Sequence, residues 1–409
     1  MINKPYSEYK DVFILSFISI IAGIIIGIID TVFGKVLIEI TEFRDANPLM
    51  LIPFLSIAGI FIIYTYSKIG KNSIKGMSLI FESAHGEEEG IPKRLVPLVM
   101  LTTWITHLFG GSAGREGVAV QIGATVADIA GSRQKIKNAK KIMLITGMAA
   151  GFAGLFQTPI AAVFFALEVL TVGIIEYKAL IPSVVASFTA SFTSHFLGLE
   201  KFSFNLNSSI EVTPDFIFKM ILIGIIFGIV GGAFAHFLSK GKKYLSYKIE
   251  NPIKRIFIIG IFLSIVLLLL HMGRYSGLGT NLISKSFNGE QIYNYDWILK
   301  FILTIITLSA GFQGGEVTPL FSIGASLGVV LALVLGMPVE FVAALGYAAV
   351  FGSATNTFLA PIFIGAEVFG YQYMPYFFII CTIAYFFNGS KSIYAAQKNL
   401  EQADNLKEI

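Results

Sequence analysis

Long apolar runs separated by short polar segments recur along almost the whole sequence. A helix needs about 20 mainly apolar residues to cross a bilayer. The first run, residues 12–29, has no small-residue cleavage site and predicts a retained helix, not a removed signal peptide. Further runs occupy residues 49–66 and 95–109. The pattern predicts an all-α, polytopic membrane protein.

Glycine or proline interrupts many of these runs. Both residues weaken a helix interior, because glycine is flexible and proline lacks an N–H donor. We therefore expect broken and partial helices beside full spans. The interruptions fall at Gly34, Pro53, Gly110, Pro159, Gly311, Pro319 and Pro361.

The second half of the chain repeats the first. Residues 110–126 match 311–327 without a gap at an offset of 201, and Glu168-Val169 matches Glu367-Val368 at an offset of 199. Chance similarity between Gly/Ala-rich segments is the alternative. Paired repeats with broken helices indicate a transporter whose site lies between the halves near the membrane midplane. The expected divisions are a first half at 1–239, a basic linker at 240–255, a second half at 256–396 and a short polar cytoplasmic tail at 397–409 without a soluble domain.

Composition and charge agree with a membrane protein. Of 409 residues, 55% are hydrophobic and 14% charged, which excludes a soluble domain of this size. Basic clusters at the N-terminus, 133–141 and 240–255 mark cytoplasmic loops by the positive-inside rule, so both termini are expected in the cytoplasm. Nucleic-acid binding would also use basic clusters, but no soluble domain surrounds these. The single Cys381 excludes an intrachain disulfide.

A glycine-rich turn at residues 110–118 carries an Arg-Glu pair between two apolar runs. A charge inside a bilayer is costly unless it faces a cavity or a partner, so Glu116 is a candidate functional residue. The segment after the turn predicts a helix, and a helix N-terminus is a ready anion site. We therefore expect Glu116 and a permeating anion to compete for one site.

Three motifs together resemble the CLC family of anion channels and proton-coupled antiporters. They are Gly-Ser-Ala-Gly-Arg-Glu-Gly at 111–117, the segment from Gly-Phe-Ala-Gly to Ala-Leu-Glu at 151–168, and Gly-Gly-Glu-Val-Thr-Pro-Leu-Phe-Ser-Ile-Gly-Ala at 314–325. The resemblance covers essentially the whole membrane part. It implies a CLC-type inverted-repeat fold, a homodimer with one pathway in each subunit, and Glu116 as the gating glutamate.

Departures from the common family pattern resemble its fluoride/proton antiporter branch. Met77 follows Gly76 where chloride proteins carry a serine, and Val118 replaces a proline. Val169 stands where chloride antiporters carry an inner proton glutamate. Further departures are Glu316, Val317 and Thr318, at positions that are usually apolar, whereas an anion-coordinating tyrosine is retained as Tyr394.

The resemblance and the residue chemistry give each candidate a role. Glu116 and Glu316 are expected to gate the pathway or transfer protons, with a fixed Arg115–Glu116 salt bridge and a structural pairing of Glu316 as the alternatives. Thr318 is expected to donate its hydroxyl to Glu316, to Glu116 or to the ion. Packing for Met77 and an interfacial anchor for Tyr394 remain the alternative interpretations.

The remaining candidates support the site. The expected anion-binding residues are Gly76, Met77, Gly117, Val118, Val317 (through its backbone N–H), Thr318 and Tyr394, and the expected structural residues are Gly114, Arg115, Gly314 and Gly315. Glu168 and Glu367 are expected at helix ends, and His107 in packing. The five histidines have no metal-ligand spacing, so neither a metal nor a cofactor is expected.

The function predicted from these features is proton-coupled fluoride export, with fluoride, protons and the lipid bilayer as partners, in the plasma membrane. A chloride channel or chloride/proton exchanger on the same CLC fold is the alternative, and Val169 favours it. An intramembrane hydrolase using Ser112 with a histidine is the other class, but no His-Glu-x-x-His helix or partnered His–Asp pair supports it. We expect no enzyme and no nucleic-acid partner.

Overall fold

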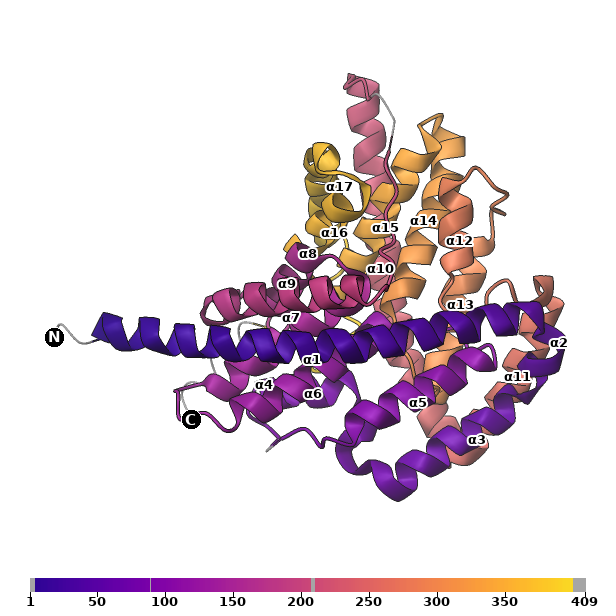
Figure 1. Cartoon of the computed structure of the whole chain (residues 1–409). Coiled ribbons are helices and arrows are strands. Elements are labelled where there is room, and N and C mark those ends of the chain that lie inside the picture. Colours follow the sequence, from indigo (N-terminus) through magenta and orange to yellow (C-terminus); the bar gives the residue numbers. More distant parts are fainter. Residues whose placement is uncertain (1–3, 89, 207–209, 400–409) are drawn as a thin grey trace.

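The computed structural model describes residues 4–88, 90–206 and 210–399. Helices make up almost all regular structure in these residues, so the all-α prediction is confirmed. Figure 1 shows α1 and α9 crossing the molecule side by side, whereas α10 and α12 to α15 stand steeply to them.

The earlier helices are α1 (Lys4–Ala46), α2 (Pro48–Leu51), α3 (Leu55–Thr65), α4 (Met77–Ala84), α5 (Leu95–Leu108), α6 (Glu116–Gly131), α7 (Ala139–Phe156), α8 (Pro159–Glu168), α9 (Leu180–Phe196) and α10 (Pro214–Lys248). The later ones are α11 (Pro252–Leu269), α12 (Thr280–Phe287), α13 (Asp296–Ala310), α14 (Val317–Leu335), α15 (Val339–Thr355), α16 (Leu359–Phe369) and α17 (Met374–Phe386).

Full spans and partial helices occur together, as predicted. In the described part of the chain, six segments are long and apolar enough to cross a membrane: Tyr9–Ala46, Pro48–Lys75, Ala139–Phe156, Pro214–Lys248, Pro252–Leu269 and Val317–Leu335. The most apolar window of α1 is only 33% buried, whereas that of α14 is 78% buried. Helix α1 therefore lies at the lipid-facing surface and α14 in the interior. Helices α5, α8, α15 and α16 are apolar but shorter.

Most of the predicted interruptions begin or end a helix. Gly110 and Gly311 have positive φ angles just after α5 and α13, and Pro159 is the first residue of α8, where a missing N–H costs no helical bond. Pro53 lies in a short 3-10 turn, and Pro319 and Pro361 lie in the first turns of α14 and α16. The expectation at Gly34 is wrong, because α1 continues through it. There a Cβ would meet Leu199 and Leu155 at 2.9 and 3.0 Å, so Gly34 serves helix packing.

Glycine pairs hold the central helices close together. A Cβ on Gly123 of α6 would lie 2.1 Å from the carbonyl oxygen of Gly147 in α7. At the equivalent place in the second half, a Cβ on Gly324 of α14 would lie 2.1 Å from the carbonyl oxygen of Gly346 in α15. Side chains at these positions would force the backbones apart. These contacts fix the positions of α6 and α14, whose first residues belong to the candidate site.

Two glutamates cap helices of the opposite half reciprocally. The Glu168 carboxylate, at the end of α8, accepts hydrogen bonds from the backbone N–H groups of residues 358–360 at 3.1, 3.0 and 2.8 Å, at the start of α16. In return, Glu367 of α16 accepts from residues 160 and 161 of α8 at 3.2 and 2.8 Å. A carboxylate at a helix N-terminus satisfies free donors and complements the helix dipole. The predicted helix-end role of both glutamates agrees with these bonds.

The basic segment at 240–255 is largely helical. Lys240–Lys248 forms the last turns of α10, and α11 starts at Pro252, so three residues connect the two helices. Asn251 caps α11 by accepting from the N–H groups of Ile253 and Lys254. The polar tail predicted at 397–409 lies mostly outside the described residues.

Candidate functional site

Two helices from opposite halves begin side by side at the predicted turn. Helix α6 starts at Glu116 and α14 at Val317. Just before them, Gly114 and Gly315 form an antiparallel bridge, with N···O distances of 2.5 and 2.8 Å. The two residues are 201 positions apart, the offset of the sequence repeat. Two helix N-termini, with their free N–H groups and positive dipole ends, thus meet at one place.

Glycine is required in these turns because neighbouring atoms approach the backbone too closely for a side chain. A Cβ on Gly114 would lie 2.8 Å from Pro319 Cδ and 3.0 Å from the Gly315 carbonyl oxygen. Gly314 has a φ of +150°, and a Cβ there would lie 2.5 Å from that of Ala113. The structural role proposed for Gly114, Gly314 and Gly315 follows from these contacts.

Glu116 is fully buried and bound to the other half of the protein. Its Oε2 accepts hydrogen bonds from the backbone N–H of Thr318 at 3.1 Å, from the Thr318 hydroxyl, and from the backbone N–H of Arg115 at 3.4 Å. Its Oε1 has no hydrogen-bond partner, and Arg115 Nε lies 3.7 Å from it without a hydrogen bond. The carboxylate therefore sits at the N-terminus of α14, and the Arg115–Glu116 pair is the weaker contact.

A cavity of about 440 Å³ lies beside these helix ends. Of the predicted residues, Gly76, Met77, Gly117, Gly314, Gly315, Glu316 and Tyr394 line it. Its charged lining consists of Lys75, Lys242, Lys243, Arg255 and Glu316, so cations outnumber carboxylates there. Glu116, Thr318, Val118 and Val317 are buried behind this lining. Positive charge around a cavity with low-dielectric walls concentrates anions.

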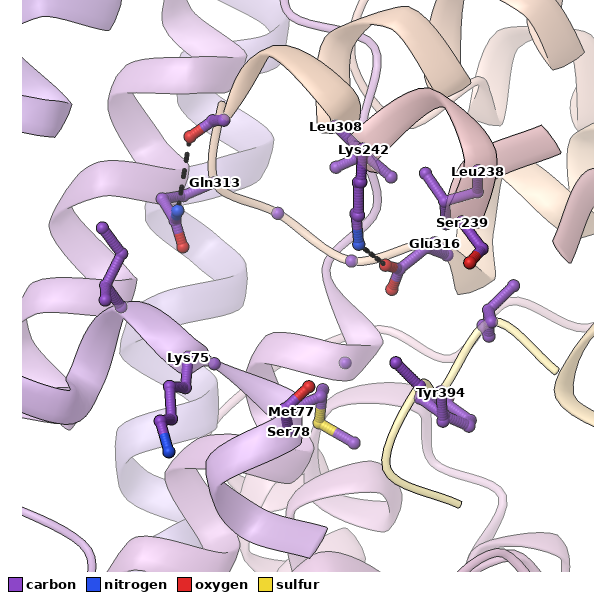
Figure 2. Close-up of a pocket in the computed structure, with 18 of the residues that line it drawn as sticks. Lys75, Met77, Ser78, Leu238, Ser239, Lys242, Leu308, Gln313, Glu316 and Tyr394 are labelled. Atoms are coloured by element: carbon purple, nitrogen blue, oxygen red, sulfur yellow. Dashed lines mark hydrogen bonds and ion pairs between the residues drawn. The ribbon is translucent and has the colours of Figure 1, made fainter. Parts of the chain in front are cut away.

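Glu316 faces the cavity and pairs with a lysine from α10. Its Oε1 lies 3.6 Å from Lys242 Nζ, and its side chain is 12% exposed, compared with 48% for the lysine. Figure 2 shows this pair across the cavity from Lys75 and Met77. The carboxylate has a cation partner, as the structural interpretation of Glu316 requires, and lies next to the start of α14, as the transport interpretation requires.

Helix α4 supplies another helix N-terminus at the cavity. It begins at Met77, and Gly76 before it has a φ of +56°. A Cβ on Gly76 would lie 3.5 Å from Gln121 Oε1, which is buried and has no partner, while Gln121 Nε2 donates to the Gly117 carbonyl at 3.2 Å. The Gln121 amide oxygen of α6 thus lies beside the start of α4 with its acceptor free.

Tyr394 brings a buried hydroxyl to the same cavity. Its ring packs against Phe81 and Phe165, with centroid distances of 5.1 and 6.2 Å, and its hydroxyl has no hydrogen-bond partner. A buried hydroxyl without a partner is costly. A position inside the cavity wall, 6% exposed, disagrees with the alternative of an interfacial anchor.

The family model described as voltage gated chloride channel matches residues 58–389. A chloride/fluoride channel protein from Pseudomonas syringae pv. tomato is 35% identical over 88% of this chain and 80% of its own length. The chain belongs to the CLC family. An H(+)/Cl(-) exchange transporter from Vibrio cholerae is 24% identical over 82% of the chain and 76% of its own length.

Solved CLC structures have the same fold. The crystal structure of a CLC-type fluoride/proton antiporter superposes with a TM-score of 0.94 at 53% identity, covering 96% of this chain and 99% of that one. A slow cyanobacterial Cl-/H+ antiporter, at 19% identity, superposes with a TM-score of 0.79 and covers 96% and 98% of the two chains. The predicted resemblance to the CLC family and its fluoride/proton branch is confirmed, and so is the CLC-type fold.

The backbone N–H group that holds the Glu116 carboxylate belongs to Thr318, next to the Val317 N–H that was predicted to bind the anion. The Thr318 hydroxyl binds Glu116, which is one of the three partners expected for it. Val169 is buried, and its carbonyl accepts from Gln397 Nε2 at 2.9 Å, so no carboxylate stands at that position.

Some polar residues of this CLC site escaped the sequence analysis. Lys242 and Gln313 line the cavity, and Lys300 and Thr304 form a buried polar cluster with Ser112 of the 110–118 turn. Gln121 and Lys300 could have been found from the sequence, because each is a polar residue inside an otherwise apolar helix. Ser112 bonds to Thr304 and Lys300, and no hydrogen bond joins it to a histidine in the described part of the chain, which weakens the hydrolase alternative.

Proposed function

We propose that this protein is a fluoride/proton antiporter that exports fluoride in exchange for protons, with Glu116 as its gate. Both the solved structure at 53% identity and the exchange transporter at 24% identity are described as proton-coupled antiporters, which supports ion antiport. The observation that carries the proposal is the buried Glu116 carboxylate at the N-terminus of α14, held by Thr318 beside a cation-lined cavity.

Exchange follows from competition for the same donors. The ionised Glu116 occupies the N–H and hydroxyl of Thr318. When Glu116 takes up a proton it loses its charge, its hold on these donors weakens, and the side chain can leave. Fluoride then accepts the two hydrogen bonds, and it departs when Glu116 releases its proton and returns. Because the donors serve one anion at a time, proton and fluoride movements are coupled.

The cavity prepares fluoride for this exchange. Fluoride is small and strongly hydrated, so N–H and O–H donors must replace its water. Three helix starts supply backbone donors or dipole ends: at Gly76 and Met77, at Gly117 and Val118, and at Val317. Tyr394 supplies an unpaired hydroxyl. The thioether of Met77 removes the hydroxyl donor expected for chloride, and it is flexible and polarizable.

Glu316 is proposed as the second carboxylate of proton transfer. It lies directly before α14 and faces the cavity, so a proton from Glu116 can reach solvent through it. Lys242 holds its carboxylate toward the cavity. This route compensates for Val169, which leaves the usual position of the inner proton group without a carboxylate.

The proposed setting is the plasma membrane, as a homodimer with one pathway per subunit and both termini in the cytoplasm. The basic segment 133–141 after α6 and the basic end of α10 support this orientation. Exposed apolar side chains on α9 and α17, such as Phe192 and Phe386, support contact with lipid or a second copy. The division into halves at 1–239 and 256–396, joined by 240–255, is part of the proposal.

Flux from proteoliposomes tests the function. Liposomes containing purified protein are loaded with fluoride or chloride, and anion efflux and external pH are recorded together. We expect fluoride efflux with proton uptake, slow chloride efflux, and loss of proton movement in Glu116→Gln. Uphill fluoride movement driven by an imposed proton gradient alone completes the case for antiport.

A chloride channel or chloride/proton exchanger on this fold is the second candidate, favoured by Val169. Equal fluoride and chloride efflux without proton movement would identify a channel. Chloride efflux with proton uptake would identify a chloride exchanger. Either result would overturn the roles given to Met77 and Glu316.

A further inference from the structure

A second cavity, of about 770 Å³, lies between α10 and α13, and we call it the α10–α13 groove. It shares no lining residue with the cation-lined cavity. The residues that α10 contributes follow one helix face: Val230, Ala233, Phe237, Lys240, Gly241 and Tyr244. Leu238 and Lys242, on another face of the same turns, line the cation-lined cavity instead. The two cavities therefore lie on different sides of α10.

The walls of the groove are apolar and partly exposed. Helix α13 contributes Trp297, Ile298, Phe301, Ile302, Ile305 and Ile306. The rings of Phe234 and Phe237 pack edge-on against Phe301, with centroid distances of 5.3 and 6.4 Å, and join the two helices there. Among the lining side chains, Ile229, Phe237 and Ile302 are 55%, 53% and 43% exposed. In a protein that crosses the bilayer, an apolar surface of this kind contacts lipid tails.

The groove follows one half of the membrane-crossing part of α10. Residues 220–239 contain no Asp, Glu, Lys or Arg and lie between Lys219 and Lys240. A helix of about 20 residues is about 30 Å long, which is the thickness of the hydrocarbon core. The groove begins at Ile229, in the middle of this stretch, and continues to Lys240 and Tyr244. Its α10 side therefore extends from the middle of the bilayer to one edge, which is the depth of a single lipid tail.

The basic end of the groove carries groups that suit a phosphate. Lys240 is exposed, and it is the one charged side chain among the described residues that line the groove. Its ammonium has no ion pair or hydrogen bond in the described part of the chain. Tyr244 and Lys248 follow at intervals of four residues, on the same side of α10. Lysines at the edge of a bilayer attract the negative headgroups of anionic lipids.

We propose that the α10–α13 groove binds an anionic phospholipid. One acyl chain lies between α10 and α13, and the phosphate binds Lys240 and the Tyr244 hydroxyl. A free phosphate ion would gain nothing from the apolar walls, and a lipid without net charge would gain less from the unpaired lysine. The groove is separate from the cation-lined cavity, so the inference goes beyond the proposed function.

Native mass spectrometry of the purified full chain in detergent measures lipid binding directly. The protein is titrated with phosphatidylglycerol, or with phosphatidylcholine that has the same acyl chains. We expect phosphatidylglycerol to bind severalfold more tightly, because only its headgroup carries a net negative charge. Lys240→Met should weaken phosphatidylglycerol binding about fivefold and leave phosphatidylcholine binding unchanged. Equal affinities of the wild type for the two lipids, or unchanged phosphatidylglycerol binding in Lys240→Met, would overturn the site.

Two controls make this result specific. Lys254→Met removes an exposed lysine of the same basic segment that does not line the groove, and it should keep the phosphatidylglycerol affinity within about twofold. Glycerol 3-phosphate carries a phosphate without acyl chains, and it should not displace phosphatidylglycerol at matched concentrations. Displacement would assign the site to a free phosphate and overturn the proposal.

Ala233→Phe tests the apolar part by filling the groove. The larger ring occupies space between α10 and α13, so both lipids should bind more weakly. Leu222→Phe adds the same ring at a partly exposed position of α10 outside the groove and should bind both lipids as the wild type does. Normal lipid binding in Ala233→Phe would exclude the acyl chain from the groove. If Ala233→Phe does not fold, the Lys240→Met measurement still decides.

A second copy of the chain is the other apolar partner that would cover this groove. Ile302→Cys in a Cys381→Ser background tests it, because oxidation in native membranes links two copies whose grooves face each other. We expect single chains on a non-reducing gel, and a disulfide-linked pair would overturn the lipid proposal. None of these measurements uses ion flux. Absence of proton-coupled fluoride flux would therefore refute the proposed function alone, and unaltered lipid binding in the variants would refute this inference alone.

Discussion

At the scale of single residues, the proposed exchange depends on how few donors hold an anion at the start of α14. Thr318 supplies two of them, a backbone N–H and a hydroxyl, and both bind Glu116 Oε2. The other carboxylate oxygen has no hydrogen-bond partner and only Arg115 Nε at 3.7 Å, so the hydrogen bonds to Glu116 all end on one oxygen. In the proposed mechanism, Glu116 held in this way blocks the anion site but can be released. Protonation removes the charge that strengthens its two hydrogen bonds with Thr318.

Thr318→Val removes the hydroxyl donor and keeps the size of the side chain. A hydrogen bond to a charged group contributes about 1.5–3 kcal/mol, so fluoride bound in the vacated site should lose affinity about tenfold or more. The measurement is calorimetric fluoride binding in a Glu116→Gln background, where no carboxylate competes. Thr318→Ser retains the hydroxyl and should stay within about threefold of the parent. Unchanged affinity in the valine variant would exclude the hydroxyl from the anion site.

Glu316 and Lys242 form one ion pair but should differ in their effect on transport. The lysine is 48% exposed, so solvent screens its charge and its loss should cost less than about 1 kcal/mol of stability. Lys242→Met should therefore change the fluoride rate only a few-fold and keep the proton-to-fluoride ratio. Glu316→Gln removes a proton acceptor that is 12% exposed, and the ratio should fall severalfold.

The ratio is obtained from simultaneous fluoride and pH recordings, with Lys243→Met as a control on the same turn of α10. A Glu316→Gln protein that keeps the wild-type ratio would leave Glu316 as a structural partner of Lys242. That is the interpretation which the sequence left open.

At the scale of helices, the two halves stabilise each other through their ends. Glu168 and Glu367 cap the opposite partial helix, and the rings of Phe164 and Phe363 stack between these helices at 4.5 Å. Short helices such as α8 and α16 cannot satisfy their own ends in a membrane. The carboxylates of Glu168 and Glu367 supply acceptors for the free N–H groups at these helix starts, where water is absent.

Glu168→Gln should lower stability and leave coupling intact. The carboxylate accepts three N–H groups at the start of α16, and an amide oxygen cannot replace its charge, so we expect a loss of about 1–2 kcal/mol. Thermal unfolding in detergent measures it, as a lower Tm. Exposed Glu211 offers a control, since Glu211→Gln should leave Tm unchanged. A normal Tm together with lost proton coupling would instead place Glu168 on the proton route.

The sequence predicted the helices well where local pattern decides them. The starts of α6 and α14 follow from glycine turns, and the repeat matches Gly114 with Gly315, which the structure joins in a backbone bridge. Gly34 was predicted wrongly, because only the packing of Leu199 explains a glycine inside a continuous helix. The Lys242–Glu316 pair joins residues far apart in the chain, and no local spacing indicates it.

At the scale of the whole molecule, lipid and interior impose different compositions on the helices. Helix α1 exposes large apolar side chains such as Phe13 and Phe17, whereas α6 and α14 are buried and rich in small residues. The site therefore lies on interior helices whose ends are surrounded by protein. Outer helices supply the hydrophobic surface and, at the ends of α10 and α11, basic residues that line the cavity.

The side of the membrane to which the cation-lined cavity opens can be determined by cysteine labelling. Lys137 lies in the exposed basic loop before α7, and exposed Asn288 begins the segment 288–295 between α12 and α13, which has no lysine or arginine. The positive-inside rule places residue 137 in the cytoplasm and 288 outside.

The native Cys381 is buried and contributes little background. An impermeant maleimide added to intact cells should label Asn288→Cys and leave Lys137→Cys unlabelled until the cells are lysed. The opposite pattern would make the cation-lined cavity, with Lys75 and Arg255, an outward-facing entrance, and fluoride export would then start from the other side of Glu116.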